Sequence, residues 1–395
     1  MKIFKLMLVA LVATLGFTAC DNEPEHIYDD HSADIVGTWS CLTENYAEVL
    51  IINADGSAVS YGVEDGEYWE NVRGTVTVKE NNITMIFEDD DNFTGHFDII
   101  PGQAFSLFED TGERYIYQYC ANDLADEIIG MWVVANGTPD MTIETYYEDG
   151  RSTFTGIVNG EMTLKHERNY KVVGDLSFHT TIEDPSTYVA QRLIYSPNAT
   201  SYGDLMTWQL NNDFSFTRLR VKQYLNLDGK VYDYNSAYVS NAKGKDEDFS
   251  IVGHTFNMDK INAGDFDVMF RSVLYCLEFL NDATVKQHFL SDGVERGFET
   301  PITVDGNKVT LDMSVGNPAF RKVDMYMFQD ADDSQLHIYM PTASFINYFA
   351  NLEFVTMLQD GKIDPTDATA VAKVYADMEA RIQSINVSLV FKARK

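Results

Sequence analysis

The strongest constraint on the fold of this chain is an internal repeat. The segment Ile35–Trp39 recurs as Ile128–Trp132, and a third version, Ile251–Gly253, is followed by Phe256. Self-similarity of this kind is typical of chains that build one supersecondary unit several times. The sequence therefore predicts three copies of one design.

Each copy is followed by two apolar stretches with a turn between them. Asp-Gly and Asn-containing turns tolerate the positive φ that tight hairpins need, so these stretches are predicted strands. The turns are Asn53 to Gly56 after Val49–Ile52, Asp149-Gly150 between Met141–Tyr147 and Ser152–Val158, and Asn281-Asp282 between Val273–Leu280 and Thr284–Leu290.

Within the copies, apolar and polar residues alternate with a period of two, as in Lys308–Met313 and Ile385–Phe391. This pattern is typical of antiparallel sheets with one buried face. About eight such strands fit between Thr38 and Cys120, and hairpins can join all of them. We therefore expect a mainly β protein made of tandem antiparallel up-and-down barrels. A seven-stranded sandwich is the alternative for each unit.

The residues that open the first two copies resemble a known family. Gly37-x-Trp39 and Gly130-x-Trp132, each on the first strand of an eight-stranded meander, are similar to the lipocalin and calycin superfamily. More closely, the chain resembles the lipocalin-like domains of Bacteroidota lipoproteins, many of unknown function. The third copy departs from this pattern, with Phe256 in place of tryptophan. The resemblance implies lipocalin-like barrels, but a fold does not carry ligand transport with it.

The third copy also contains two predicted helices. Thr342–Gln359 has an apolar stripe and ends before Gly361. A second helix is predicted to begin at Asp364 as N-cap, with Pro365 at the first helical position. Both interrupt the meander before its last strand, Ile385–Phe391, where they can act as a structural plug or as a lid over the barrel.

The repeats set the expected domain boundaries. Strand-like residues 230–239 could belong to either the second or the third unit, and 243–247 resemble a linker. The expected segments are a signal peptide over 1–20, a tether over 21–33, barrel 1 over 34–123, barrel 2 over 127–246, and barrel 3 with its C-terminal helices over 248–395.

The N-terminus predicts where the protein is located. Lys2 and Lys5 precede the apolar stretch Leu6–Leu15, and Phe17–Cys20 resembles a bacterial lipobox. This resemblance implies lipidation of Cys20 and anchoring in the outer membrane through the acyl chains. We expect the protein to be exposed on the cell surface, and the periplasmic face is the alternative.

Three cysteines remain after the lipobox. Cys41 and Cys120 lie on the first and last predicted strands of barrel 1, which are neighbours in a closed barrel. A disulfide between them is therefore possible in an exported protein, but two buried free thiols are the favoured interpretation. Cys276 is expected to be a core residue.

The sequence contains no motif that predicts an enzyme, a metal site or a cofactor. Neither an H-E-x-x-H, a G-x-S-x-G nor a phosphate-binding loop is present. The acidic turns 89–92 and 330–333 lack the full calcium-loop pattern and are better explained as solvated hairpin turns. A net charge of −32 argues against nucleic acid as a partner.

Two functional hypotheses remain, and neither names a binding residue. In the first, the protein binds a small hydrophobic ligand or a glycan, through the larger third barrel or through an exposed aromatic patch. Tyr115, Tyr117 and Tyr119, which share one face of a predicted strand, are among the rings that could form such a patch. In the second, solid barrels form a structural or interaction module that contacts another protein. An eight-stranded barrel of about 90 residues has little interior room, which favours the third barrel for a pocket.

Overall fold

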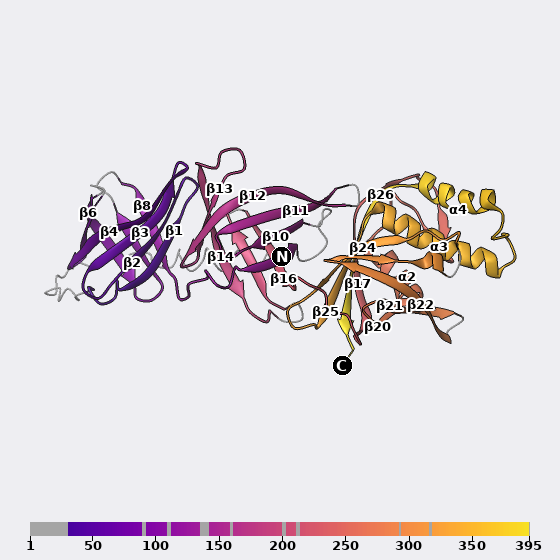
Figure 1. The fold of residues 1–395 in the computed structure, drawn as a ribbon. Coiled ribbons are helices and arrows are strands. Elements are labelled where there is room, and N and C mark those ends of the chain that lie inside the picture. Colours follow the sequence, from indigo (N-terminus) through magenta and orange to yellow (C-terminus); the bar gives the residue numbers. More distant parts are fainter. Residues whose placement is uncertain are drawn as a thin grey trace, which may run out of the picture.

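The chain forms three closed eight-stranded antiparallel barrels that follow one another in a row (Figure 1). This confirms the predicted fold class, and the eight-stranded barrels fit a lipocalin-like fold. Cys20, most of the tether and the acidic turn 89–91 lie outside the described residues. The computed structural model describes residues 31–88, 92–108, 112–134, 142–158, 161–199, 203–210, 214–291, 294–315 and 318–394. Within this part, no helix combines the length and hydropathy that a membrane crossing requires.

In barrel 1, every strand pairs with the next one in sequence, and β1 closes the ring against β8, with Trp39 opposite Tyr119. This is the up-and-down order that the hairpin turns predicted. The strands are β1 (Gly37–Leu42), β2 (Tyr46–Ile52), β3 (Ser57–Glu64), β4 (Glu67–Lys79), β5 (Asn82–Phe87), β6 (Asn92–Ile100), β7 (Ala104–Phe108) and β8 (Arg114–Tyr119).

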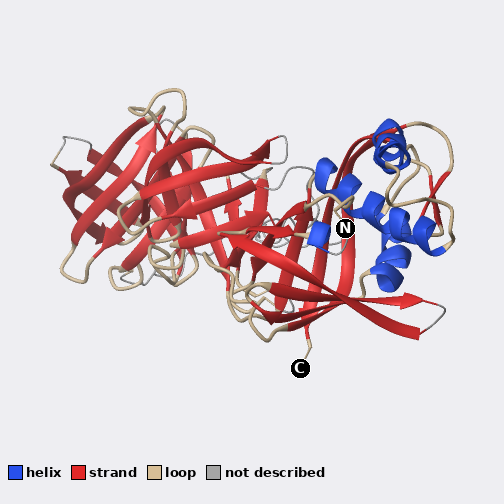
Figure 2. Ribbon diagram, turned by 45° about the vertical axis from the view of Figure 1, so that its right-hand side comes forward, coloured by secondary structure: helices blue, strands red, loops and turns tan. Residues whose placement is uncertain are grey.

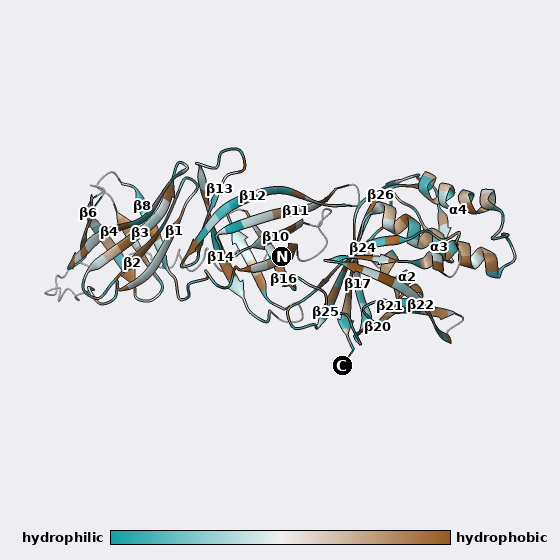
Figure 3. Cartoon of the chain, viewed as in Figure 1, coloured by the Kyte–Doolittle hydropathy of each residue, from teal (hydrophilic) through white to brown (hydrophobic). Residues whose placement is uncertain are grey.

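Barrel 2 repeats this order and closes by pairing β16 with β9. Teal and brown alternate along its strands in Figure 3, as expected where one face is solvated and the other is packed. The strands are β9 (Gly130–Val134), β10 (Thr142–Tyr146), β11 (Arg151–Val158), β12 (Glu161–Val173), β13 (Leu176–Thr180), β14 (Tyr188–Ser196), β15 (Leu205–Gln209) and β16 (Ser215–Val221).

The tryptophans of the repeat have the same role in both barrels. Trp39 and Trp132 are fully buried. The Trp39 Nε1–H donates to the carbonyl of Ile35 at 2.7 Å, and the Trp132 Nε1–H donates to the carbonyl of Ile128 at 2.6 Å. Each ring therefore fixes the segment that leads into its barrel.

Barrel 3 begins earlier than the sequence predicted. Its first strand is β17 (Val231–Gly244), which pairs with β20 (Cys276–Asn281) and β26 (Ile382–Ala393). Residues 231–244 therefore belong to barrel 3 and not to the predicted unit 127–246. The remaining strands are β21 (Thr284–Ser291), β22 (Val294–Asp305), β23 (Lys308–Leu311), β24 (Val323–Gln329) and β25 (Gln335–Met340).

The third copy of the repeat was assigned wrongly. Ile251–Gly253 does not open a barrel strand. Ile251 ends β18 (Phe249–Ile251), and Val252 and Gly253 form the turn to β19 (His254–Phe256), so the segment belongs to a separate two-stranded sheet. Val252 and Gly253 both have positive φ, at 48° and 78°, which a hairpin turn requires. The Ile-Val-Gly match is therefore a turn in an excursion between β17 and β20.

The same excursion contains a helix that the sequence analysis missed. Helix α2 (Ala263–Val273) has Asn262 as N-cap and a capping box with Asp265. The strand predicted over Val273–Leu280 therefore starts too early, since Val273 ends α2 and β20 begins at Cys276.

The two C-terminal helices are present, and together with α2 they gather at one side of barrel 3 (Figure 2). Helix α3 (Thr342–Gln359) has the predicted bounds. Helix α4 (Ala368–Arg381) starts later than predicted, because Asp367 is its N-cap and accepts hydrogen bonds from the backbone N–H groups of Thr369 and Ala370. Asp364 instead accepts from the N–H of Thr366 within the preceding turn.

The outer faces of barrels 1 and 2 pack against each other. The Tyr68 ring of barrel 1 stacks on Tyr188 of barrel 2, with centroids 4.6 Å apart. Arg192 of barrel 2 donates to Gln118 Oε1 at 2.7 Å and to Ser40 Oγ at 3.0 Å on barrel 1. The apolar part of this interface consists of Ala47, Val49, Val63, Val173, Leu176 and Phe178.

A second interface joins barrels 2 and 3. The backbone N–H of Met162 donates to the Tyr326 hydroxyl at 2.8 Å, and Lys222 Nζ donates to Asp333 Oδ1 at 2.5 Å. Apolar side chains buried between neighbouring barrels hold them together. At the interface of barrels 2 and 3 these residues are Val133, Ile143, Leu219, Val221, Tyr326, Phe328 and Tyr339.

Candidate functional site

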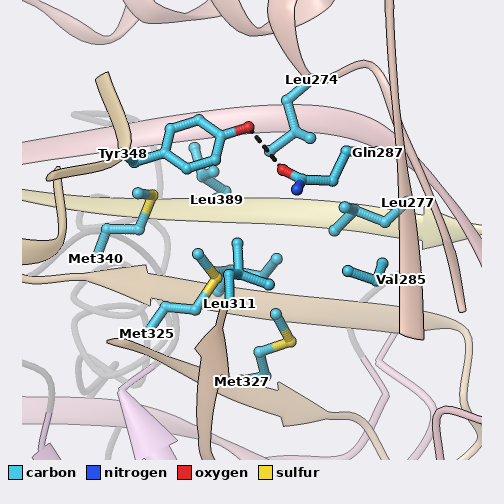
Figure 4. A pocket seen from close by; sticks show the side chains of 11 residues that line it. Leu274, Leu277, Val285, Gln287, Leu311, Met325, Met327, Met340, Tyr348 and Leu389 are labelled. Carbon is cyan, nitrogen blue, oxygen red and sulfur yellow. Dashed lines mark hydrogen bonds between the residues drawn. The ribbon is translucent and has the colours of Figure 1, made fainter. Parts of the chain in front are cut away.

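The interior of barrel 3 is almost completely filled by side chains. Its cavity measures about 10 Å³, which is roughly the room of one water molecule. Figure 4 shows the side chains that converge on it, with the Tyr348 hydroxyl donating to Gln287 Oε1 at 2.9 Å. This cavity is far smaller than the roughly 300 Å³ at which ligand pockets start, so it does not admit a hydrophobic ligand.

Helix α3 is the reason for this filling. The rings of Phe345 and Phe349 are buried and lie 5.6 Å from Phe266 and Phe270 of α2, centroid to centroid. Tyr348, from the same helix, reaches inside the barrel. The helices are therefore built as a plug, as the first of the two sequence interpretations proposed.

A larger cleft lies between barrels 2 and 3 and measures about 700 Å³. It is bordered by β11 of barrel 2 and by β17, β25, β26, α3 and α4 of barrel 3. The cleft is lined by Ile157, Asn241, Lys243, Arg321, Tyr339, Pro341, Thr342, Ala343, Ile346, Asn347, Glu379, Gln383, Ser384 and Asn386.

The polar side chains of this cleft are held in place by the fold. Arg321 lies 4.1 Å above the ring of Tyr375 and donates to Glu379 Oε1 at 2.7 Å and to Asn347 Oδ1 at 3.3 Å. The Thr342 hydroxyl donates to the carbonyl of Ile385 at 2.9 Å and fixes the start of α3 on β26. The cleft thus offers positioned amides, hydroxyls and one guanidinium–carboxylate pair.

A second candidate site lies inside barrel 2, where the strand register directs charged side chains inward. Glu144 on β10 pairs with Arg168 on β12 and with Arg218 on β16, whose Nη2 lies 3.4 Å from Glu144 Oε2. Four more residues surround this triad and are fully buried. We call the seven residues the polar core of barrel 2: Glu144, Tyr146, Ser152, Arg168, His179, Trp208 and Arg218.

Aromatic rings connect the members of the polar core. The Tyr146 ring lies 6.1 Å from Trp208 and 5.9 Å from His179, centroid to centroid. Arg218 lies 5.8 Å from the Trp208 ring. Burial, and then the charge of Glu144, raise the pKa of Tyr146 well above 10, so its hydroxyl stays protonated.

Buried His179 predicts a pH-dependent stability. Burial, and then the charge of Arg168, lower its pKa well below 6.5. Below pH 6.5 the unfolded chain binds a proton at His179 that the folded chain does not, so stability is lost as pH falls. We expect a loss of about 2 kcal/mol between pH 6.5 and 5 from this group. Urea unfolding of wild type and His179→Gln measures it.

The comparison with the variant is needed because another buried group acts in the opposite direction. Burial raises the pKa of Asp330 to about 6, so this carboxyl favours the folded state at lower pH. Asp330 is unchanged in His179→Gln and cancels in the difference. Equal pH slopes for both proteins would refute a neutral, buried His179.

Barrel 1 also contains a buried carboxylate, but its partners are hydroxyl groups. Glu48 accepts hydrogen bonds from the hydroxyls of Tyr46 at 2.7 Å, of Ser60 at 2.5 Å, and of Tyr117. Among the described residues, no lysine or arginine pairs with it. The three hydroxyls therefore compensate the burial of this side chain.

The possible Cys41–Cys120 disulfide is not formed, in agreement with the favoured interpretation of two buried free thiols, and the β1–β8 register gives the reason. Both residues are free thiols in the structure. Trp39 faces Tyr119, so Cys41 falls opposite Tyr117, about 10 Å along the strand from Cys120. Disulfides need Cα atoms within about 7 Å. Burial raises the pKa of both thiols to about 12, and Cys120 Sγ donates to Asp175 Oδ1 at 3.0 Å.

Other predicted features have structural roles. Cys276 is buried, as expected for a core residue. In the acidic turn 330–333, Asp333 pairs with Lys222 and Lys230, and among the described residues no group of three or more potential ligands could hold a metal ion. Tyr117 points into barrel 1 and is 3 % exposed, so it is not part of a surface patch.

The sequence analysis missed both the cleft and the polar core. The cleft is formed by elements from two barrels, and no local motif marks it. The polar core had one usable signal: Glu144, Arg168 and Arg218 are charged residues inside predicted strands, where a buried charge requires a partner.

Comparisons with known proteins give little guidance. No protein-family model and no curated protein matches the chain. Two crystal structures of mutants of the vaccine antigen Transferrin Binding Protein B from Haemophilus parasuis Hp5 are similar at 11 % and 10 % identity. The alignments cover 89 % of this chain and 66 % and 67 % of those chains, with TM-scores of 0.25 and 0.23. The chain spans about two thirds of their length, and likeness at this level carries no argument about function.

Proposed function

We propose that this protein is a non-catalytic lipoprotein that binds a hydroxyl-rich ligand, a glycan, in the cleft between barrels 2 and 3. The observation that carries the proposal is the size of this cleft, about 700 Å³, together with its lining by four amide side chains, Asn241, Asn347, Gln383 and Asn386. The volume of the cleft lies within the usual range of ligand pockets, whereas the cavity of barrel 3, about 10 Å³, is too small.

The donor set favours a sugar over an apolar ligand. Each amide side chain both donates and accepts hydrogen bonds, and so does each sugar hydroxyl. Thr342 and Ser384 add two more groups that do both, while Ile157 and Ile346 supply apolar contacts for C–H faces. An apolar ligand cannot form hydrogen bonds with the amide side chains of Asn241 and Gln383, whereas sugar hydroxyls can.

The location is part of the same proposal. The lipobox at Phe17–Cys20 supports a lipid anchor of the Bacteroidota type in the outer membrane, with the barrels exposed at the cell surface. A glycan site is useful there, because extracellular polysaccharides reach it without crossing a membrane. Shaving intact cells with protease tests this: surface exposure predicts cleavage, and the periplasmic alternative predicts protection.

An interaction module remains the second candidate. Leu290 and Val294, near the tip of the β21–β22 hairpin of barrel 3, are 44 % and 58 % exposed. Exposed apolar side chains of this kind can anchor a protein partner. In this case glycans would not bind, and the hairpin would be the contact surface.

Screening the purified protein on an immobilised glycan panel tests the cleft. We expect Asn347→Ala and Gln383→Ala each to weaken binding of the retained glycan by about tenfold, the value of a lost hydrogen bond of about 1.4 kcal/mol. Gln103→Ala, an exposed amide on barrel 1, is the matched control and should bind as wild type. If no glycan is retained, or if the cleft variants bind normally, the proposal is wrong.

A further inference from the structure

The polar core of barrel 2 contains five buried polar atoms that form no hydrogen bond with a described residue. These atoms are Trp208 Nε1, Arg218 Nε, Ser152 Oγ, His179 Nδ1 and the Tyr146 hydroxyl oxygen. The five residues are at most 6 % exposed. Buried polar groups in proteins are almost always hydrogen-bonded, so five of them within one barrel indicate that something else occupies their partner positions.

The hydrogen-bond roles of these atoms follow from their chemistry. The Trp208 Nε1–H and Arg218 Nε–H groups can only donate. The Ser177 hydroxyl donates to the carbonyl of Gln191 at 3.3 Å, so it accepts from His179 Nε2 at 2.9 Å. His179 Nδ1 of the neutral ring is then an acceptor. The unmet demand is therefore mainly for acceptor atoms, with one donor.

The net charge of the polar core also indicates that an anion is missing from it. Arg168 and Arg218 carry two positive charges, and Glu144 carries one negative charge, so the triad has a net charge of +1. Their side chains are 15 %, 7 % and 3 % exposed. An unbalanced buried charge is costly, and water supplies hydrogen bonds but no counter-charge. A small monoanion supplies both.

We propose that the polar core of barrel 2 binds a small oxygen-bearing monoanion, either a carboxylate or an inorganic oxyanion. Its oxygens accept from the Trp208 Nε1–H, the Arg218 Nε–H and the Ser152 hydroxyl, and its charge balances the triad. Arg168, the most exposed member of the triad, marks the side on which an anion enters. The site is separate from the cleft, so either can exist without the other.

Hydrogen exchange of the purified protein measures this binding. Sodium acetate and sodium nitrate are the probes, and sodium chloride at equal ionic strength is the reference. A ligand that binds only the folded state at ten times its Kd slows exchange through unfolding about tenfold. We expect this slowing in peptides that cover β10–β12. An effect of acetate alone identifies a carboxylate site, and an effect of nitrate alone identifies an inorganic oxyanion site.

Two variants locate the site without removing a charge. Trp208→Phe keeps an aromatic ring, although a smaller one, and removes one donor, and Ser152→Ala removes another. Each should weaken the affinity for the anion about tenfold, since a hydrogen bond to a charged group is lost, so the slowing at the same anion concentration should fall from about tenfold to about twofold. Trp69→Phe is the matched control, because the Trp69 Nε1–H in barrel 1 donates to Ser60 Oγ at 2.8 Å. If Trp208→Phe fails to fold, Ser152→Ala carries the test.

Three results would overturn the proposal. Acetate and nitrate could slow exchange no more than chloride does. Both variants could respond to the anions as wild type does. Finally, a high-resolution crystal structure grown with acetate or nitrate could show water alone beside Trp208 Nε1 and Arg218 Nε.

Discussion

Glu144→Gln is expected to lower the free energy of unfolding of barrel 2 by about 3–5 kcal/mol. The substitution keeps the shape of the side chain but removes the only negative charge of the triad, which leaves Arg168 and Arg218 buried without a counter-charge. Trp132 and Trp208 lie in barrel 2, but Trp39 and Trp69 lie in barrel 1, so tryptophan fluorescence during urea unfolding reports on both barrels. Hydrogen exchange in peptides of β10–β12 is therefore the measurement that isolates barrel 2. The buffer should contain no acetate or nitrate.

Glu161→Gln is the matched control for this prediction. Glu161 pairs with Lys308 at 3.0 Å, but its side chain is 67 % exposed. Exposed ion pairs contribute about 1 kcal/mol or less, so this variant should unfold nearly as wild type does. A Glu144→Gln protein with the stability of this control would show that the buried triad does not stabilise barrel 2.

Phe349→Ala is expected to destabilise barrel 3 by about 3–5 kcal/mol. The Phe349 ring is fully buried and lies within 6 Å of the rings of Phe270, Phe345 and Tyr348, so its removal leaves a cavity beneath α3. A lid that opens would instead tolerate the change. All four tryptophans lie in barrels 1 and 2, so hydrogen exchange in peptides of α2, β17 and β26 is the measurement.

Lys373→Ala, on the exposed side of α4, is the control for the plug. Surface substitutions of this kind change stability by about 0.5 kcal/mol or less. Faster exchange confined to α3 in Phe349→Ala, with the barrel strands unchanged, would contradict the plug and restore the lid.

The parts of the fold that depend on local signals could be predicted from the sequence. Period-two alternation and Asp-Gly turns indicated hairpin-linked strands, and the apolar stripe with Gly361 gave the bounds of α3. Local signals do not show to which barrel β17 belongs, because its residues alternate as in any strand. Only its pairing with β26 places it in barrel 3, and β26 begins 138 residues after β17 ends (382 − 244).

The candidate sites were hidden for a related reason. On β10, Ile143 packs against barrel 3 while Glu144 faces the inside of barrel 2, so both faces of the strand are buried. Alternation then no longer tells which face is inside. Arg168 and Arg218 meet Glu144 only through the strand register, and the cleft needs the relative placement of two barrels. Neither follows from a single sequence.

The closure of barrel 1 determines how the molecule would carry a mechanical load. Trp39 near the start of the barrel faces Tyr119 near its end, and the backbone N–H of Cys120 donates to the carbonyl of Thr38 at 2.8 Å. A pull between a lipid anchor and a glycan held at the cleft would therefore pass directly from residue 38 to residue 120. The other strands of barrel 1 would carry tension only after the hydrogen bonds between β1 and β8 break.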